Sequence, residues 1–144
     1  MIYLDTTTLV PLLVHERESL AVRARVAALP AAELAISEWT MTEFVSAVGI
    51  KVRMRELDAP TGHEVVVAFH RMADESLTIL TPGPEDFALA GEYLSRFDAG
   101  LQAGDALHLA IASNNNAQRM YSLDQALLKS ARKLKIAVQL LALI

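Results

Sequence analysis

A regular alternation of short strand-like runs with longer helix-like stretches restricts the fold of this chain more than any other feature. Five short apolar runs occur, and the first four are each followed by a stretch with the spacing or capping signals of a helix. This alternation predicts an α/β domain in which a mostly parallel sheet of about 4–5 strands is flanked by helices. The chain of 144 residues has the length of one domain, so we expect a single unit over residues 1–144.

The expected elements follow from the position of apolar runs and of capping residues, prolines and glycines. Strands are predicted at residues 2–4, 33–36, 77–80, 119–122 and 136–140. A first helix is predicted to begin near Leu9, with residues 6–8 as its cap, and a fourth is expected from about Gly62 to Ala73. The other helices are expected at residues 19–29, 38–57, 85–96, 103–113 and 125–134.

Composition excludes several classes of protein. Hydrophobic residues make up 53% of the chain, which excludes disorder, and the absence of cysteine excludes disulfides, thiolate zinc sites and cysteine nucleophiles. No apolar stretch has the roughly 20 residues of a membrane span, and the N-terminus lacks the basic region of a signal peptide. We therefore expect a cytoplasmic protein with no membrane partner. The net charge of −4 argues against binding of nucleic acid through overall charge.

Four acidic residues stand apart from the mixed polar stretches that hold most of the others. Asp5, Glu43, Asp105 and Asp124 each lie in an otherwise apolar stretch that contains no Lys or Arg. Asp5 and Asp124 follow predicted strands, where open α/β sheets place their ligand crevice. Each aspartate could instead cap a helix, whereas Glu43 lies inside its helix. Because a lone buried carboxylate is costly unless it is paired or binds a cation, the set favours a shared function.

Oxygen ligands of this kind suit hard cations such as Mg²⁺ or Mn²⁺, with water and a substrate phosphate completing the coordination. Such an ion can activate water and neutralise charge on a phosphate during an in-line displacement. The residues alone therefore favour metal-dependent hydrolysis of a phosphate ester.

The chain resembles the PIN-domain family, and in particular the VapC-type toxin ribonucleases, at four motifs that occur in the family's order. These are the opening MIYLDTT, the TEF around Glu43, the DALHLA that begins at Asp105 and the YSLD that ends at Asp124. The match spans nearly the whole chain. Gln102 departs from the pattern, because many members have Arg before the third motif.

The resemblance implies a Mg²⁺- or Mn²⁺-dependent endoribonuclease, the toxin of a type II toxin–antitoxin pair. It implies that the metal ligands and catalytic residues are Asp5, Glu43, Asp105 and Asp124, with Thr6 and Ser122 as supporting hydroxyls. It also implies an RNA substrate, a homodimer and a cognate antitoxin protein as partner. Two alternatives stay open: a non-catalytic PIN-fold interaction module, and a PIN-type nuclease outside toxin–antitoxin systems, including one directed at DNA or flaps.

Two groups of basic residues and one histidine are further candidates. Both basic groups follow a proposed ligand on the same helical stretch, so they either form solvated helix faces or flank the groove and contact RNA phosphates. They are Lys51, Arg53 and Arg55 in the first group and Lys129, Arg132 and Lys133 in the second. His108 lies one turn after Asp105 and could approach the site, but packing near the site is favoured over a role as ligand.

Overall fold

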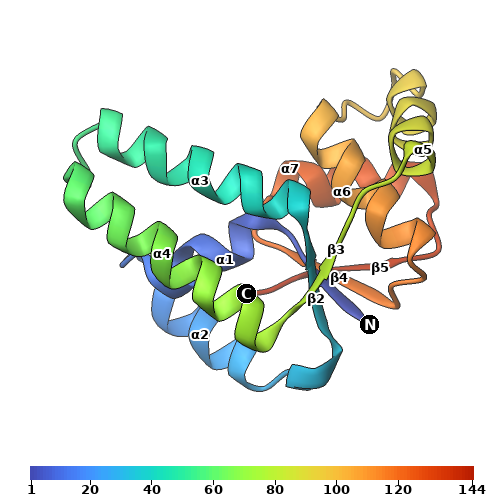
Figure 1. The fold of residues 1–144 in the computed structure, drawn as a ribbon. Helices are drawn as coiled ribbons and strands as arrows, with labels where there is room; N and C mark the ends of the chain where they lie inside the picture. The colour runs from blue at the N-terminus through green and yellow to red at the C-terminus, as the bar shows by residue number, and fades with distance from the viewer.

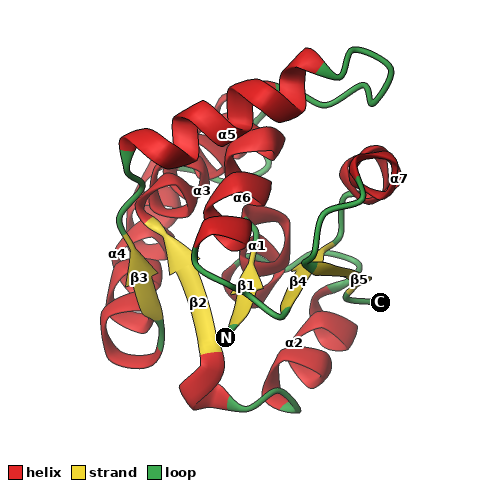
Figure 2. Ribbon diagram, turned by 90° about the vertical axis from the view of Figure 1, so that its right-hand side faces the viewer, coloured by secondary structure: helices red, strands yellow, loops and turns green.

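Five short strands form one parallel sheet in the computed structural model, which describes residues 1–144. The strands are β1 (Ile2–Leu4), β2 (Leu34–Ser37), β3 (Thr78–Leu80), β4 (Arg119–Ser122) and β5 (Gln139–Ala142). Their order is β3-β2-β1-β4-β5, as Figure 2 shows, and every neighbouring pair is parallel. The predicted α/β class with a parallel sheet is confirmed. The chain reverses its direction of progress at β1, so the C-terminal ends of β1 and β4 flank the topological switch point.

The helices cover the two faces of the sheet in chain order (Figure 1). On one face lie α1 (Thr6–Leu13), α2 (Ser19–Ala27), α3 (Glu38–Arg53) and α4 (Ala59–Ser76), and on the other lie α5 (Pro84–Ser95), α6 (Ala103–Asn114) and α7 (Gln125–Leu134). A 3₁₀ turn, η1 (Ala31–Glu33), precedes β2. None of these helices is both long and apolar enough to cross a membrane.

Two hydrophobic clusters hold the layers together, and β1 contributes to both because its side chains alternate between the faces. Ile2 and Leu4 belong to the cluster under α1, α3 and α4, where the rings of Phe44 and Phe69 stack with centroids 3.8 Å apart. Tyr3 points to the opposite cluster, formed mainly by α5, α6 and α7. This packing fixes the C-terminal end of β1 between helices from both halves of the chain.

The first helix corrects the sequence prediction, because it begins at Thr6 and not near Leu9. Asp5 is its N-cap: the Asp5 side chain accepts a hydrogen bond from the Thr8 backbone N–H at 3.2 Å. The Thr8 hydroxyl donates to the Asp5 carbonyl at 2.8 Å. A carboxylate cap of this kind satisfies a free N–H of the first turn. The predicted threonine cap was therefore wrong, and these threonines belong to the first turn.

Other boundaries also shift from the predicted ones. Helix α3 ends at Arg53, short of the predicted residue 57, and Arg55 then turns the chain with a left-handed φ of 60°. Helix α4 begins at Ala59 under an Asp58 cap, because Pro60 in its first turn needs no hydrogen-bond partner for its nitrogen. Helix α2 ends at Ala27, and β5 lies at residues 139–142 because that register pairs it with β4.

Candidate active site

Three of the four predicted carboxylates meet at the C-terminal edge of the sheet, in a pocket of about 290 Å³. The pocket is lined by Asp5, Thr6, Thr7, Glu43, Ser46, Ala47, Ile50, Asp105 and His108. Three separate segments supply the acids: the end of β1, the second turn of α3 and the first turn of α6. Asp124 lies outside the lining but close enough for its charge to raise the pKa of Asp105.

Asp5 is buried, with 2% of its surface exposed, and both of its carboxylate oxygens are hydrogen-bonded. The Thr7 hydroxyl donates to Oδ1 at 2.6 Å, and the Ser122 hydroxyl donates to Oδ2 at 2.5 Å. Burial raises the pKa of Asp5, while the hydrogen bonds from Ser122 and Thr7 oppose that rise. The two hydroxyls therefore favour the ionised form of Asp5, while burial keeps its pKa above the usual range.

Ser122 is expected to be a strong determinant of stability. Its hydroxyl is buried, donates to Asp5 and accepts a hydrogen bond from the Asp124 backbone N–H at 2.9 Å. Replacing Ser122 with Ala leaves both partners without this hydroxyl, so we expect a loss of about 1–3 kcal/mol in the free energy of unfolding. Urea unfolding at neutral pH measures this loss. Replacing Ser95, an exposed serine at the end of α5, with Ala is the matched control, and equal stability of the two variants would contradict the assignment.

Glu43 lies on the second turn of α3 and is held by one of its oxygens. Oε2 accepts a hydrogen bond from the Thr6 hydroxyl at 2.5 Å and lies 2.6 Å from His108 Nε2. Burial acts to raise the pKa of Glu43. The hydrogen bond and electrostatic attraction to His108 and the hydrogen bond from Thr6 have a larger, opposite effect, so the pKa of Glu43 is lowered. Glu43 is therefore ionised at neutral pH.

Asp105 and Asp124 differ in their hydrogen bonds. Asp124 caps α7, since its Oδ1 accepts from the backbone N–H groups of Ala126 at 2.7 Å and Leu127 at 3.0 Å. Asp105 is the third residue of α6 and makes no side-chain hydrogen bond, so it is not a cap. Burial, and then the negative charge of Asp124, raise the pKa of Asp105 to about 6. Asp105 is thus the one carboxylate of the four whose side chain has no hydrogen-bond partner.

The donor set fits a hard divalent cation. The carboxylates of Asp5, Asp105 and Asp124 form no salt bridge with Lys or Arg, and the basic side chain in contact with Glu43 is His108. The side chains do not, however, form a ready-made cluster of three or more ligands around one point. Mg²⁺ and Mn²⁺ bind through one or two carboxylates and retain several waters, so oxygen donors spaced around an open pocket suit them. The pocket therefore fits a hydrated ion, held partly through water.

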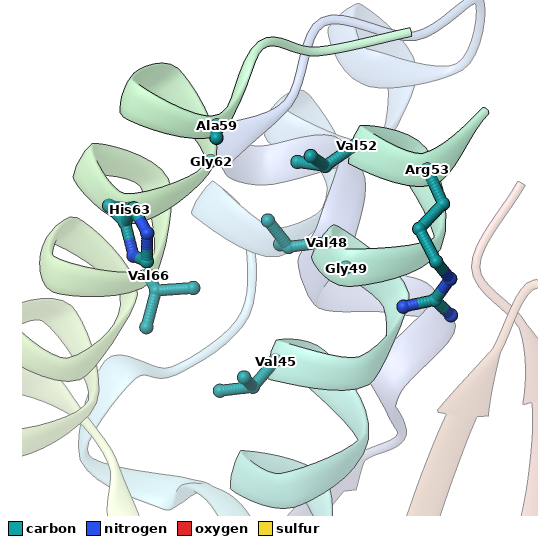
Figure 3. A pocket seen from close by; sticks show the side chains of 9 residues that line it. All are labelled: Val45, Val48, Gly49, Val52, Arg53, Ala59, Gly62, His63 and Val66. Carbon is teal, nitrogen blue, oxygen red and sulfur yellow. The ribbon is translucent and has the colours of Figure 1, made fainter. Parts of the chain in front are cut away.

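No residue of the first basic group lines the acidic pocket. Lys51 is engaged by the carboxylates of Glu16 and Glu56, and Arg55 lies beyond the end of α3. Arg53 folds over Gly49 and lines a separate pocket of about 280 Å³ between α3 and α4, shown in Figure 3. Valines of α3 and α4 face each other across that pocket, and no acidic residue lines it. This groove therefore has the chemistry of an apolar contact surface.

The second basic group lies on α7, the helix that Asp124 caps. Lys129, Arg132 and Lys133 are exposed, and Lys133 Nζ donates to the Asp98 carbonyl at 2.8 Å. Lys129 and Arg132 form no ion pair and point into solvent. These two residues on the Asp124 helix are therefore available to a polyanion.

The sequence prediction did not identify two residues that shape the site, Thr7 and Tyr3, and it placed His108 near the site without naming its partners. Thr7 donates to Asp5, whereas the predicted supporting residue Thr6 serves Glu43. His108, buried at 2% exposure, joins Glu43 to the hydroxyl of Tyr3. The available signal was a histidine in an otherwise apolar helix, next to a carboxylate without a partner.

Comparison with known proteins identifies the family. The family model described as PIN domain matches residues 2–133, which is most of the chain. The chain belongs to the PIN-domain family. A search of curated proteins finds no match. The acidic pocket at the sheet's switch point is therefore the pocket of a PIN domain, and the family expected from the four motifs is confirmed.

Solved structures similar to this PIN domain include a toxin and toxin–antitoxin complexes. The sarcin–ricin loop cleaving toxin VapC20 of Mycobacterium tuberculosis has a TM-score of 0.73 and 18% identity, over 96% of this chain and 99% of that one. DNA-bound VapBC of Salmonella typhimurium has a TM-score of 0.72 and 12% identity over 99% and 98% of the two chains. VapBC2 of Rickettsia felis, bound to a promoter DNA fragment, has a TM-score of 0.67 and 17% identity over 99% of this chain and 98% of that one. At these identities the likeness is one of fold.

Proposed function

We propose that this PIN-domain protein is a Mg²⁺- or Mn²⁺-dependent endoribonuclease, the toxin of a VapBC-type toxin–antitoxin system. One observation carries the proposal: Asp5, Glu43 and Asp105 converge in one pocket from three segments, with Asp124 beside them and no Lys or Arg to neutralise them. Structural packing alone gives no reason to gather negative charge in this way, because like charges raise each other's cost. A bound cation supplies the reason.

Each residue has a distinct part in this proposal. Asp5, Glu43 and Asp105 hold the ion, and Asp124 adds negative charge beside Asp105. Thr7 and Ser122 orient Asp5 through its two oxygens, and their hydrogen bonds favour the ionised form against the effect of burial. The ion, when bound, supplies polarisation of water and neutralisation of charge on the scissile phosphate. Because the pKa of Asp105 is about 6, protons compete with the ion for this carboxylate as the pH falls through that value.

We propose RNA as the substrate and α7 as part of the path that it follows. Exposed Lys129 and Arg132 lie on the helix that starts at Asp124, so a phosphate backbone that enters the pocket passes near them. VapC20, a structure of the same fold, cleaves the sarcin–ricin loop, which makes a structured RNA loop the first substrate to assay.

We propose an antitoxin protein and a second copy of the chain as partners. The similar solved structures include VapBC complexes, and the apolar groove between α3 and α4 offers a surface for a protein segment. A second apolar pocket lies between α5, α6 and the start of α3, next to Phe87, whose surface is 59% exposed. Light scattering of the purified protein tests the proposed homodimer.

A cleavage assay tests the proposed function. Labelled RNA containing a structured loop and DNA of the same sequence are incubated with the purified protein in Mn²⁺, in Mg²⁺ and in excess EDTA. We expect cleavage of RNA with either ion and none in EDTA. Cleavage of DNA in preference to RNA would indicate a nuclease outside toxin–antitoxin systems. Absence of cleavage of both, together with absence of a response to metal, would indicate a non-catalytic interaction module.

A further inference from the structure

A histidine with both ring nitrogens engaged separates the pocket from the hydrophobic core. His108 lies on α6, and its Nε2 is 2.6 Å from Glu43 Oε2. Its Nδ1 is 2.8 Å from the Tyr3 hydroxyl. The side chain is 2% exposed, so neither nitrogen is free to bind an ion from solvent. The geometry therefore argues against His108 as a metal ligand, although it touches a proposed one.

The polar contacts continue from Tyr3 to the start of α3. The Tyr3 hydroxyl lies 2.7 Å from Ser37 Oγ and 3.2 Å from Thr40 Oγ1. Ser37 and Thr40 form the capping box of α3, the same helix that carries Glu43. All three residues are buried. Glu43 is thus connected, through α6 and β1, to the fixed first turn of its own helix.

The two oxygens of Glu43 are in different surroundings. Oε2 receives the Thr6 hydroxyl and faces His108, whereas Oε1 accepts no hydrogen bond. Oε1 lies over Gly104 on α6, where a Cβ atom would come within 2.8 Å of it. The absence of a side chain at Gly104 therefore leaves the space that Oε1 occupies. One oxygen is anchored, and the other is the free acceptor.

We propose that His108 is a positioning residue for Glu43. His108, itself held by Tyr3, anchors Oε2 of Glu43. Gly104 leaves room for Oε1, which is then the oxygen offered to the cation. This inference rests on the proposed function, since it assigns Glu43 to a metal site. A carboxylate that binds a metal through one oxygen is commonly held by a hydrogen bond to its other oxygen. Loss of that hydrogen-bond partner weakens metal binding. It also accounts for a buried polar chain inside an apolar cluster.

Mn²⁺ titrations of several variants test the proposal, followed both by RNA cleavage and by the Mn²⁺-induced rise in melting temperature. Replacing His108 with Leu is expected to raise the Mn²⁺ concentration at half effect by about 10- to 100-fold in both measurements. Replacing His108 with Gln, whose amide N–H can reach Glu43, is expected to restore most of the affinity. Replacing Tyr3 with Phe is expected to shift the midpoint in the same direction but by less.

Two further variants separate positioning from stability. Replacing Gly104 with Ala displaces Oε1 but favours the helix, so we expect weaker Mn²⁺ binding with an undiminished melting temperature in the absence of metal. Replacing Ile111 with Val, one turn beyond His108 in the core, is the control: it lowers the melting temperature and leaves the Mn²⁺ midpoint unchanged. The Gly104 variant and the Gln variant give a result even if the Leu variant fails to fold.

The results separate a failure of the positioning role of His108 from a failure of the proposed metal-dependent function. If the wild type responds to Mn²⁺ and the His108 and Gly104 variants share its midpoint, His108 is merely structural and the inference is overturned. If the wild type shows neither cleavage nor a response to Mn²⁺, the proposed function fails, and the inference fails with it.

Discussion

Replacing Asp5 with Asn is expected to lower RNA cleavage by about 100-fold or more while leaving the fold intact. Asn has the same shape, and its carbonyl can still accept the Thr8 N–H that begins α1. Its amide group can still meet the Ser122 hydroxyl, which can accept as well as donate. Only the negative charge is lost, and loss of one preorganised electrostatic contact at a reacting centre has an effect of this size.

The same substitution at Asp58 provides a matched control. Asp58 is the N-cap of α4, accepts from the Thr61 N–H at 2.8 Å and is exposed, far along the chain from the pocket. Replacing Asp58 with Asn retains a good cap, so cleavage is expected at the wild-type rate. Initial rates on the same RNA substrate compare the three proteins. If the Asp5 variant cleaves as fast as the Asp58 variant, Asp5 has no part in the chemistry.

Replacing Asp105 with Asn is expected to stop cleavage and, at the same time, to stabilise the metal-free protein. The pKa of Asp105 rises from 3.8 to about 6 because of burial and then of neighbouring carboxylates, so ionised Asp105 is unfavourable in the fold. Because the side chain is half-buried, solvent screening limits the gain for the neutral amide to about 1–2 kcal/mol at neutral pH. Stability given up in this way is typical of functional sites.

The pH dependence of this gain follows from linkage. Between pH 3.8 and about 6, the folded wild type holds a proton on Asp105 that the unfolded chain has released. The wild type therefore loses stability as the pH rises through this window, whereas the Asn variant does not lose it. The difference between them is full at neutral pH and disappears below about pH 4.

Urea unfolding of both proteins at several pH values, with and without Mn²⁺, measures the effect of Asp105. Mn²⁺ is expected to raise the stability of the wild type and to leave the Asn variant nearly unchanged, which reverses their order. Replacing Asp74, an exposed aspartate on α4, with Asn is the control and should change little. A metal-free variant less stable than the wild type at neutral pH would contradict the account of Asp105.

The sequence predicted the order of the elements and the parallel sheet because both depend on local signals. These signals are the spacing of apolar residues and the alternation of strand-like with helix-like segments along the chain. It predicted helix ends less well. At Asp5 both a threonine cap and an aspartate cap were compatible with the residues, and the choice depended on Ser122 and Thr7 holding the carboxylate. At β5 the boundary depended on register with β4, which only pairing decides.

In the candidate site, too, the sequence predicted what local signals specify and missed what depends on tertiary contacts. Asp5, Glu43 and Asp105 stood out because each lacked a base nearby in sequence, and the parallel topology brings their segments to one edge of the sheet. The contact of His108 with Tyr3 joins residues 105 positions apart. Such a contact depends on the packing of α6 against β1, and nothing local to either residue specifies it.

Calorimetric titration of Mn²⁺ into the metal-free protein at neutral pH tests the central claim most directly. The account predicts saturable binding that weakens as the pH falls below about 6, as protons occupy Asp105, and that is lost when Asp5 is replaced by Asn. No heat beyond that of dilution, or equal binding by the Asp5 variant and the wild type, would contradict it.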